Sequence, residues 1–167
     1  MKILLADYDP RWPELFEREA DRVRAALGGR VLQLEHTGST SVPGLAAKPV
    51  IDMLLVVRDS ADEEAYVPAL EGAGYRLRFR EAHWHEHRLF NGPDTETNLH
   101  VFSHGCPEID RILRFRDWLR SHPEDRDLYA QAKRALSGKH WEQVQDYADA
   151  KTGIVEDILA RALASRE

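Results

Sequence analysis

Apolar residues follow a helical period in the first part of the chain and strand periods after it. Spacing at i, i+3 and i+4 predicts an amphipathic helix over residues 10–27, and Gly28 and Gly29 end it. The alternation in VLQLEH (31–36) predicts a half-buried strand. The segment VIDMLLVV (50–57) is apolar at both parities, which predicts a central strand covered on both faces.

The segments that follow complete a predicted sheet of about five strands. We expect a helix over residues 61–72 and then an edge strand, YRLRFR, over residues 75–80. The segments 87–90 and 97–102 flank a turn-rich NGPDTE and predict a hairpin with a long loop. The side chains of the edge strand expected to point inward are Tyr75, Leu77 and Phe79.

From Pro107 onward the pattern is helical only, with three apolar stripes. With no repeat or linker between the two parts, the sequence predicts one α/β domain over residues 1–167, a mixed sheet flanked by helices with a C-terminal helical layer. The stripes consist of Ile109, Ile112, Leu113 and Leu119; of Leu128, Ala132 and Leu136; and of Trp141, Val144, Ala148, Val155, Ile158 and Leu159.

Composition limits the classes of partner. The 167 residues are 43% hydrophobic and 31% charged, with no run of about 20 apolar residues that would cross a membrane and no signal peptide, so we expect a cytoplasmic protein. Cys106 is the only cysteine, which excludes an internal disulfide. The net charge of −6 argues against a large nucleic-acid interface, so a nucleotide partner should be small.

A turn rich in glycine and hydroxyl groups separates the first two predicted strands. In GSTSVPGLAAKP (38–49), Gly38 precedes the potential caps Ser39, Thr40 and Ser41, and the length allows a helix of one or two turns. Free amides and the helix dipole at such a start attract anions, phosphate above all. The alternative interpretation is an ordinary capped helix.

Asp52 is the one carboxylate in the central strand. An ionised carboxylate between apolar neighbours costs several kcal/mol unless it is paired or binds a metal. Strand parity places Asp52 on the same face as Leu54 and Val56. Its partner is either a structural group, for instance Lys48, or else a bound ligand or metal. We favour the ligand or metal, because such costly groups concentrate at functional sites.

These motifs resemble a known family. Gly38 and Ser39 after a strand, with Asp52 on the next strand, are similar to the fingerprint of the nucleotidyltransferase superfamily. More specifically, residues 7–163 resemble the GrpB family, in YDPRWPELFEREADRVRAAL, EHTGSTSVPGLAAKPVIDMLLVV, NLHVF, FRDWLR and YADAK. GrpB-like domains also occur fused to dephospho-CoA kinase, which suggests nucleotide or coenzyme A metabolism.

The resemblance implies a Gly-Ser turn that holds nucleotide phosphates and strand carboxylates that hold a divalent metal. Here Asp52 is the expected metal ligand, but Leu54 occupies the position of a second acid and His100 that of a third. Magnesium or manganese is favoured over zinc. His36 and His100 are candidates for proton transfer, or for binding a softer metal with Asp52.

Three functions are therefore considered. The first is binding of a nucleotide or another phosphorylated small molecule, with group transfer if the protein is an enzyme. The second is a non-catalytic binding or regulatory module that kept the phosphate site and lost the metal triad. The third is a metal-dependent hydrolase that uses His36, Asp52 and His100.

Several basic and aromatic residues are further candidates. The resemblance suggests Arg88 as an anion contact, and Lys151 interrupts the apolar seam of the last helix, where it either lies along apolar surface or reaches an acidic or phosphate partner. The remaining residues are expected to be solvated or structural. They are His83, His85 and His87 of HWHEH, with metal binding as the alternative; Arg76, Arg78 and Arg80, with a phosphate rim as the alternative; and Trp118 and Trp141 in core packing.

Overall fold

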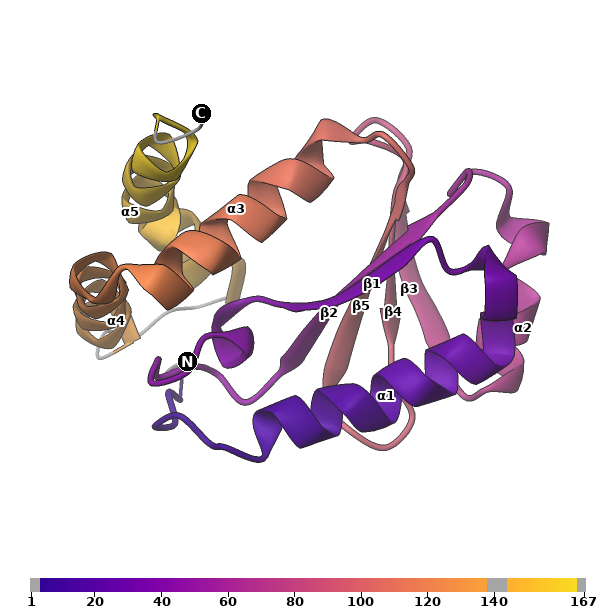
Figure 1. Ribbon diagram of the computed structural model, residues 1–167, viewed down its shortest axis with the longest axis horizontal. Helices are drawn as coiled ribbons and strands as arrows, with labels where there is room; N and C mark the ends of the chain where they lie inside the picture. Colours follow the sequence, from indigo (N-terminus) through magenta and orange to yellow (C-terminus); the bar gives the residue numbers. More distant parts are fainter. Residues whose placement is uncertain (1–3, 138–143, 165–167) are drawn as a thin grey trace.

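The computed structural model describes residues 4–137 and 144–164, which form a sheet between two layers of helices (Figure 1). Helix α1 lies along one face of the sheet and α3 crosses the other, while α4 and α5 pack beyond one end of α3. The helices are α1 (Trp12–Leu27), α2 (Val67–Gly72), α3 (Pro107–Ser121), α4 (Pro123–Ser137) and α5 (Val144–Ala164). The strands are β1 (Gln33–Thr37), β2 (Ile51–Val57), β3 (Arg76–Glu81), β4 (His87–Asn91) and β5 (Thr97–Ser103).

The described strands form one mixed sheet in the order β1-β2-β5-β4-β3. Strands β2 and β5 are parallel, and the other neighbouring pairs are antiparallel. The register sets Thr37 of β1 opposite Asp52, and Asn98 of β5 beside Asp52 on the other edge of β2. The sequence prediction of a mixed sheet with the 50–57 segment inside it is confirmed.

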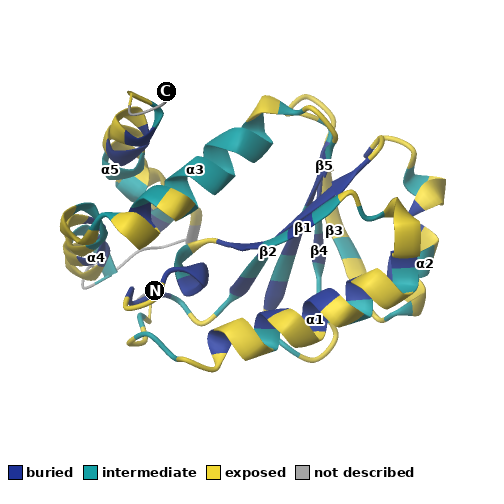
Figure 2. Ribbon diagram, viewed as in Figure 1, coloured by how far each residue is buried: buried dark blue, intermediate teal, exposed yellow. Residues whose placement is uncertain are grey.

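Strand β2 is buried on both faces, as its apolar run predicts (Figure 2). Met53 and Leu55 belong to the larger core, which is shared with α1 and α2. Leu54 and Val56 point the other way and pack with Phe102 against α3. Alternation along the strand therefore turns Asp52 toward the helical layer, as parity predicts.

The predicted helix over residues 61–72 is shorter than expected. A 3-10 turn over Glu63–Ala65 comes first, and α2 begins only at Val67. Pro68 explains the break, because a proline lacks the N–H that a continuous helix needs and fits only in a first turn.

The edge strand β3 departs from strict alternation. Tyr75 is buried and Leu77 partly buried, but Phe79 is 45% exposed, so its inward placement is wrong. The pairing of β3 with β4 shifts between Leu77 and Phe79, and such an irregularity reorients the side chains that follow it. The strand's arginines, Arg76, Arg78 and Arg80, are exposed, as expected.

The helical layer buries a different face of α4 from the one predicted. Leu128 is exposed, whereas α4 buries Tyr129, Ala130 and Lys133. Trp141 lies outside the described residues, and Trp118 packs with the α3–α4–α5 core as expected. In the part of the chain that the structure describes, no helix is long and apolar enough to cross a membrane.

Candidate functional site

The turn after β1 is tighter than the predicted helix of one or two turns. It is a single 3-10 turn over Ser39–Ser41, in which the Ser41 amide donates to Gly38 O and the Val42 amide to Ser39 O. Val42 is already extended, so the turn ends there. The turn therefore uses the Ser41 and Val42 amides in its own hydrogen bonds.

Gly38 brings this turn against Asp52. Its backbone has a φ of +69° and a ψ of −176°, a conformation available essentially to glycine alone. A Cβ on Gly38 would lie 2.9 Å from Asp52 Cβ and nearer still to Asp52 Oδ2. The glycine is thus needed for its backbone angles and for the close approach of the two strands at the site.

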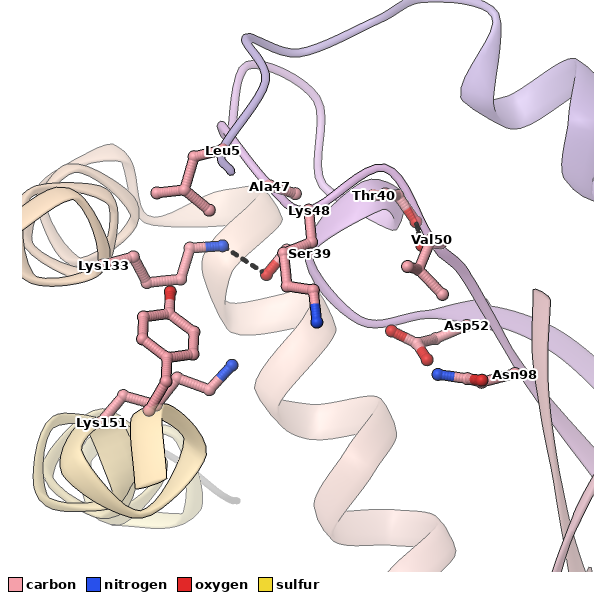
Figure 3. Close-up of a pocket in the computed structure, with 11 residues that line it drawn as sticks. Leu5, Ser39, Thr40, Ala47, Lys48, Val50, Asp52, Asn98, Lys133 and Lys151 are labelled. Carbon is pink, nitrogen blue, oxygen red and sulfur yellow. Dashed lines mark hydrogen bonds between the residues drawn. The ribbon is translucent and has the colours of Figure 1, made fainter. Parts of the chain in front are cut away.

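Lysines from three parts of the chain meet Asp52 in a small cavity of about 150 Å³ (Figure 3). Lys48 follows the turn, while Lys133 of α4 and Lys151 of α5 enter from the helical layer. Lys133 Nζ donates a 2.7 Å hydrogen bond to Ser39 Oγ. The lysine cluster, defined as Lys48, Lys133 and Lys151, therefore faces a turn hydroxyl and one carboxylate.

Burial and mutual repulsion weaken the charge of this lysine cluster. Lys133 is 2% exposed, and burial, followed by the charge of Lys151, lowers its pKa to about 7. Burial also lowers the pKa of Lys151, with Lys48 adding to the effect and Asp52 opposing it. The Lys133 ammonium lies 4.8 Å from the ring centroid of Tyr129, a cation–π contact that partly offsets desolvation.

A larger cavity of about 590 Å³ adjoins the first and shares Asp52, Asn98 and Lys151 with it. Its wall is apolar and aromatic over much of its extent. The rings that line it are Trp84, Phe102 and Phe115. The two cavities together form a cleft, polar at the lysine cluster and apolar toward α3.

His100 lines the larger cavity and lies beside Asp52, as the sequence predicts. The distance from His100 Nε2 to Asp52 Oδ1 is 3.4 Å. On its other side, His100 Nδ1 is 3.0 Å from His87 Nε2.

His36 does not join this pair, so the predicted set of His36, Asp52 and His100 is corrected. His36 neighbours Thr37 on β1 and therefore faces α1, where its ring stacks on Phe16 at 4.9 Å. Its Nε2 is 3.0 Å from Thr40 Oγ1, and burial lowers its pKa to about 4. His36 is thus a neutral, hydrogen-bonded core residue.

Arg88 also lies away from the cleft, which overturns its prediction as an anion contact. It is buried on β4, where its Nε donates to Glu63 Oε2 (2.9 Å) and its Nη1 to Glu86 Oε2 (2.8 Å). These carboxylates already occupy the guanidinium, so Arg88 serves the structure.

The HWHEH segment is a turn and not an extended strand, so its histidines do not share a face. His83 and His85 are exposed, as expected, and His85 has a positive φ of 57°. His87 is the exception: it begins β4 and is 3% exposed. Among the described residues, no three His, Cys, Asp or Glu side chains form a metal-binding group.

The donor set around Asp52 does not fit a magnesium pair. The residue at the expected second acid, Leu54, is buried against α3, and β5 offers Asn98 and His100 in place of a carboxylate. The lysine cluster shares the cavity with Asp52 and would repel a cation. The positive charge at this site is supplied by the side chains of the lysine cluster.

Sequence reasoning missed Lys133 and Asn98. Asn98 could have been found, since it lies two residues before His100 on a strand and must share its face. Lys133 gave no comparable signal, because it is a charged residue outside the apolar stripe of Leu128, Ala132 and Leu136.

The sheet order, the glycine turn and the acid on the adjacent strand define a mixed α/β fold with a basic cleft. Residues 2–161 match the family described as GrpB protein, and the chain belongs to this family.

Similar proteins cover nearly the whole chain. A UPF0157 protein of Halalkalibacterium halodurans is 64% identical over 163 residues, which are 98% of this chain and 84% of that protein. The crystal structure of the conserved protein GrpB from Enterococcus faecalis superposes with a TM-score of 0.86 at 31% identity, covering 96% of this chain and 98% of that one.

A third relative is a larger enzyme. The dephospho-CoA kinase of Mycolicibacterium paratuberculosis is 30% identical over an alignment of 186 positions, which covers 96% of this chain and 46% of the kinase. This chain therefore corresponds to about half the length of that enzyme.

Proposed function

We propose that this protein binds a nucleotide or a closely related phosphorylated small molecule in the cleft beside Asp52. The observation that carries the proposal is the convergence of the lysine cluster and the Ser39 hydroxyl on one small cavity. In the bound state the phosphates lie among these groups, and the rest of the ligand extends into the larger cavity.

The energetics of the lysine cluster favour an anionic ligand. Burial, followed by the charge of Lys151, lowers the pKa of Lys133 to about 7, so part of the population is uncharged at neutral pH. A phosphate in contact with Lys133 restores the favourable charge interaction and raises this pKa again. The cost of burying these cations in the free protein is offset when the ligand binds.

The larger cavity favours a ligand with an apolar or aromatic part over inorganic phosphate. Trp84, Phe102 and Phe115 line it, and aromatic rings bind nucleobases by stacking. The two cavities share Asp52, Asn98 and Lys151, so one molecule can reach both. Similarity to a dephospho-CoA kinase adds dephospho-CoA to the nucleotides worth testing.

Binding without a metal is part of this proposal. In a two-metal nucleotidyltransferase the cations neutralise the phosphates, and here the lysine cluster takes that place. A non-catalytic nucleotide-binding module is therefore the second candidate, and the buried Leu54 at the position of a second acid is the observation that favours it. A nucleotidyl transfer reaction remains a prediction from the resemblance.

Titration calorimetry tests the proposal. ATP, CTP, GTP and dephospho-CoA are titrated into the protein, once with MgCl₂ and once with EDTA. We expect at least one to bind, with an affinity that changes less than threefold on removal of magnesium. Lys151→Met should weaken binding at least tenfold, whereas Arg134→Met, which removes an exposed charge from α4, should not. Magnesium-dependent binding, or equal effects of the two variants, would contradict it.

A further inference from the structure

A chain of side-chain contacts leads from the cleft to the protein surface. Asp52 Oδ1 is 3.4 Å from His100 Nε2, His100 Nδ1 is 3.0 Å from His87 Nε2, and His87 Nδ1 is 2.7 Å from Glu81 Oε1. The chain of contacts thus has a carboxylate at each end and two imidazoles between them. Asp52 opens into the cleft, while Glu81 at the end of β3 is 43% exposed.

Hydrogen-bond chemistry gives this chain two possible directions. An ionised carboxylate only accepts, and a neutral imidazole donates at one nitrogen and accepts at the other. If His87 donates to Glu81, His87 Nε2 must accept from His100 Nδ1, which leaves a lone pair on His100 Nε2. If His100 instead donates to Asp52, both histidines take the opposite tautomer and Glu81 loses its hydrogen bond.

The distances favour the first direction. The contact of His87 with Glu81 has the length of a charge-assisted hydrogen bond, whereas the His100–Asp52 contact is about as long as a hydrogen bond can be. A long contact is expected where two acceptor atoms meet. His100 Nε2 and Asp52 Oδ1 then form a pair of acceptors at the cavity wall with no proton between them.

The surroundings keep His87 neutral and fixed. It is 3% exposed and packed between aromatic rings, with Phe102 at 4.9 Å and Trp84 at 5.2 Å between centroids. Burial lowers its pKa, with His100 and Arg88 adding to the effect and Glu81 opposing it. The charged side chains that share the cavity with His100 are Asp52 of β2, Arg116 of α3 and Lys151 of α5.

We propose that Glu81 and His87 hold His100 in the tautomer protonated at Nδ1, so that His100 Nε2 and Asp52 Oδ1 together accept a hydrogen bond from a hydroxyl group of the ligand. In this arrangement His100 and Asp52 contact the ligand, and His87 and Glu81 are positioning residues. The tautomer is a property of the ligand-free protein, so it is tested independently of the phosphate site.

Nuclear magnetic resonance of the full chain labelled with ¹⁵N-histidine measures the tautomers directly. In the unsubstituted protein at neutral pH, we expect both His87 and His100 to be protonated at Nδ1. Glu81→Leu removes the stronger acceptor, so Asp52 becomes the only carboxylate at the ends of the chain of contacts. Both histidines should then move their proton to Nε2, and the ¹⁵N shifts of their two nitrogens should exchange.

Two further variants complete the test. Asp52→Asn should leave both histidines protonated at Nδ1, because Glu81 still accepts the hydrogen bond from His87 Nδ1. Glu64→Leu, which removes an exposed carboxylate without a contact to either histidine, should change neither tautomer. Backbone amide spectra confirm that each variant is folded. An Nε2-protonated His100 in the unsubstituted protein, or no change on Glu81→Leu, overturns the proposal.

Discussion

Lys133 in α4 donates a hydrogen bond from its Nζ to Ser39 Oγ, 2.7 Å away in the turn that follows β1. This contact joins the C-terminal helical layer to the glycine turn of the sheet. It also holds a lysine that is 2% exposed, with a pKa lowered to about 7 by burial. Such a residue opposes folding and favours an anionic ligand, and the two effects are separable by experiment.

Replacing this lysine should therefore stabilise the protein and weaken ligand binding. An unfolded lysine has a pKa of 10.5, so lowering it to about 7 costs the folded state on the order of 3–5 kcal/mol below pH 7. Lys133→Met keeps much of the volume and removes the charge. We expect its unfolding free energy at pH 7 to rise by about 1–3 kcal/mol in urea denaturation.

The pH dependence of the unfolding free energy tests whether the lowered pKa of Lys133 is the cause of this stabilisation. Between about pH 7 and pH 10.5 the unfolded chain holds a proton on Lys133 that the folded chain lacks, so this residue makes stability rise with pH. That rise should be much smaller in Lys133→Met and nearly unchanged in Arg134→Met, because the Arg134 charge has the smallest of the effects on the pKa of Lys133. Equal pH profiles in all three proteins would show that Lys133 titrates normally.

Anion binding should be linked to proton uptake. An anion in the cavity raises the pKa of Lys133 from about 7, so the bound state holds more protons than the free state. Sulfate is a suitable probe because its own charge is constant above pH 5. Its affinity should be highest below pH 7 and fall by up to about tenfold for each pH unit above it.

Calorimetry in buffers of different ionisation enthalpy measures this linkage. The observed enthalpy of sulfate binding at pH 7.5 should vary between phosphate-free buffers in proportion to the protons taken up. Lys133→Met should remove most of this variation. A sulfate affinity that is constant from pH 6 to pH 9 would mean that the lysine cluster does not bind the anion.

The sheet was predictable because its signals are local. Strand β2 is buried on both faces, and its uninterrupted apolar run predicts this burial directly. Two departures arise from single residues: Pro68 breaks the expected helix, and the irregular pairing after Leu77 turns Phe79 to solvent. The first could have been predicted from the proline, while the second depends on the pairing of two strands.

The site was predictable only where one segment carries it. Gly38 and Asp52 belong to one strand-turn-strand unit, and Lys151 interrupts an apolar seam, so each has a sequence signal. His36 was misplaced because strand parity relative to Asp52 depends on the register between β1 and β2. Lys133 was missed because its burial results from the docking of α4 on a turn 94 residues away.

Gly38 should tolerate no side chain. Gly38→Ala combines a backbone conformation that only glycine adopts freely with a Cβ 2.9 Å from Asp52 Cβ. Strain and overpacking together should lower the unfolding free energy by about 2–5 kcal/mol in urea denaturation. Gly44→Ala is the matched control, since its φ is +82° and no atom lies within 4 Å of the added Cβ. It should cost about 1–2 kcal/mol, and an equal loss in both variants would exclude the contact with Asp52 as a cause.

Arg88 and Lys151 should have opposite effects on stability and binding. Arg88 is buried, donates to Glu63 and Glu86, and lies outside both cavities, so Arg88→Met should cost about 2–4 kcal/mol of unfolding free energy while the folded fraction keeps its ligand affinity. Lys151→Met removes a partly buried cation from the cavity wall and should lower affinity at least tenfold with little loss of stability. Urea denaturation and calorimetry on the same preparations measure both quantities. If Arg88→Met weakens binding as strongly as Lys151→Met in protein that remains folded, Arg88 contributes to the ligand site and its assignment to a structural ion pair is wrong.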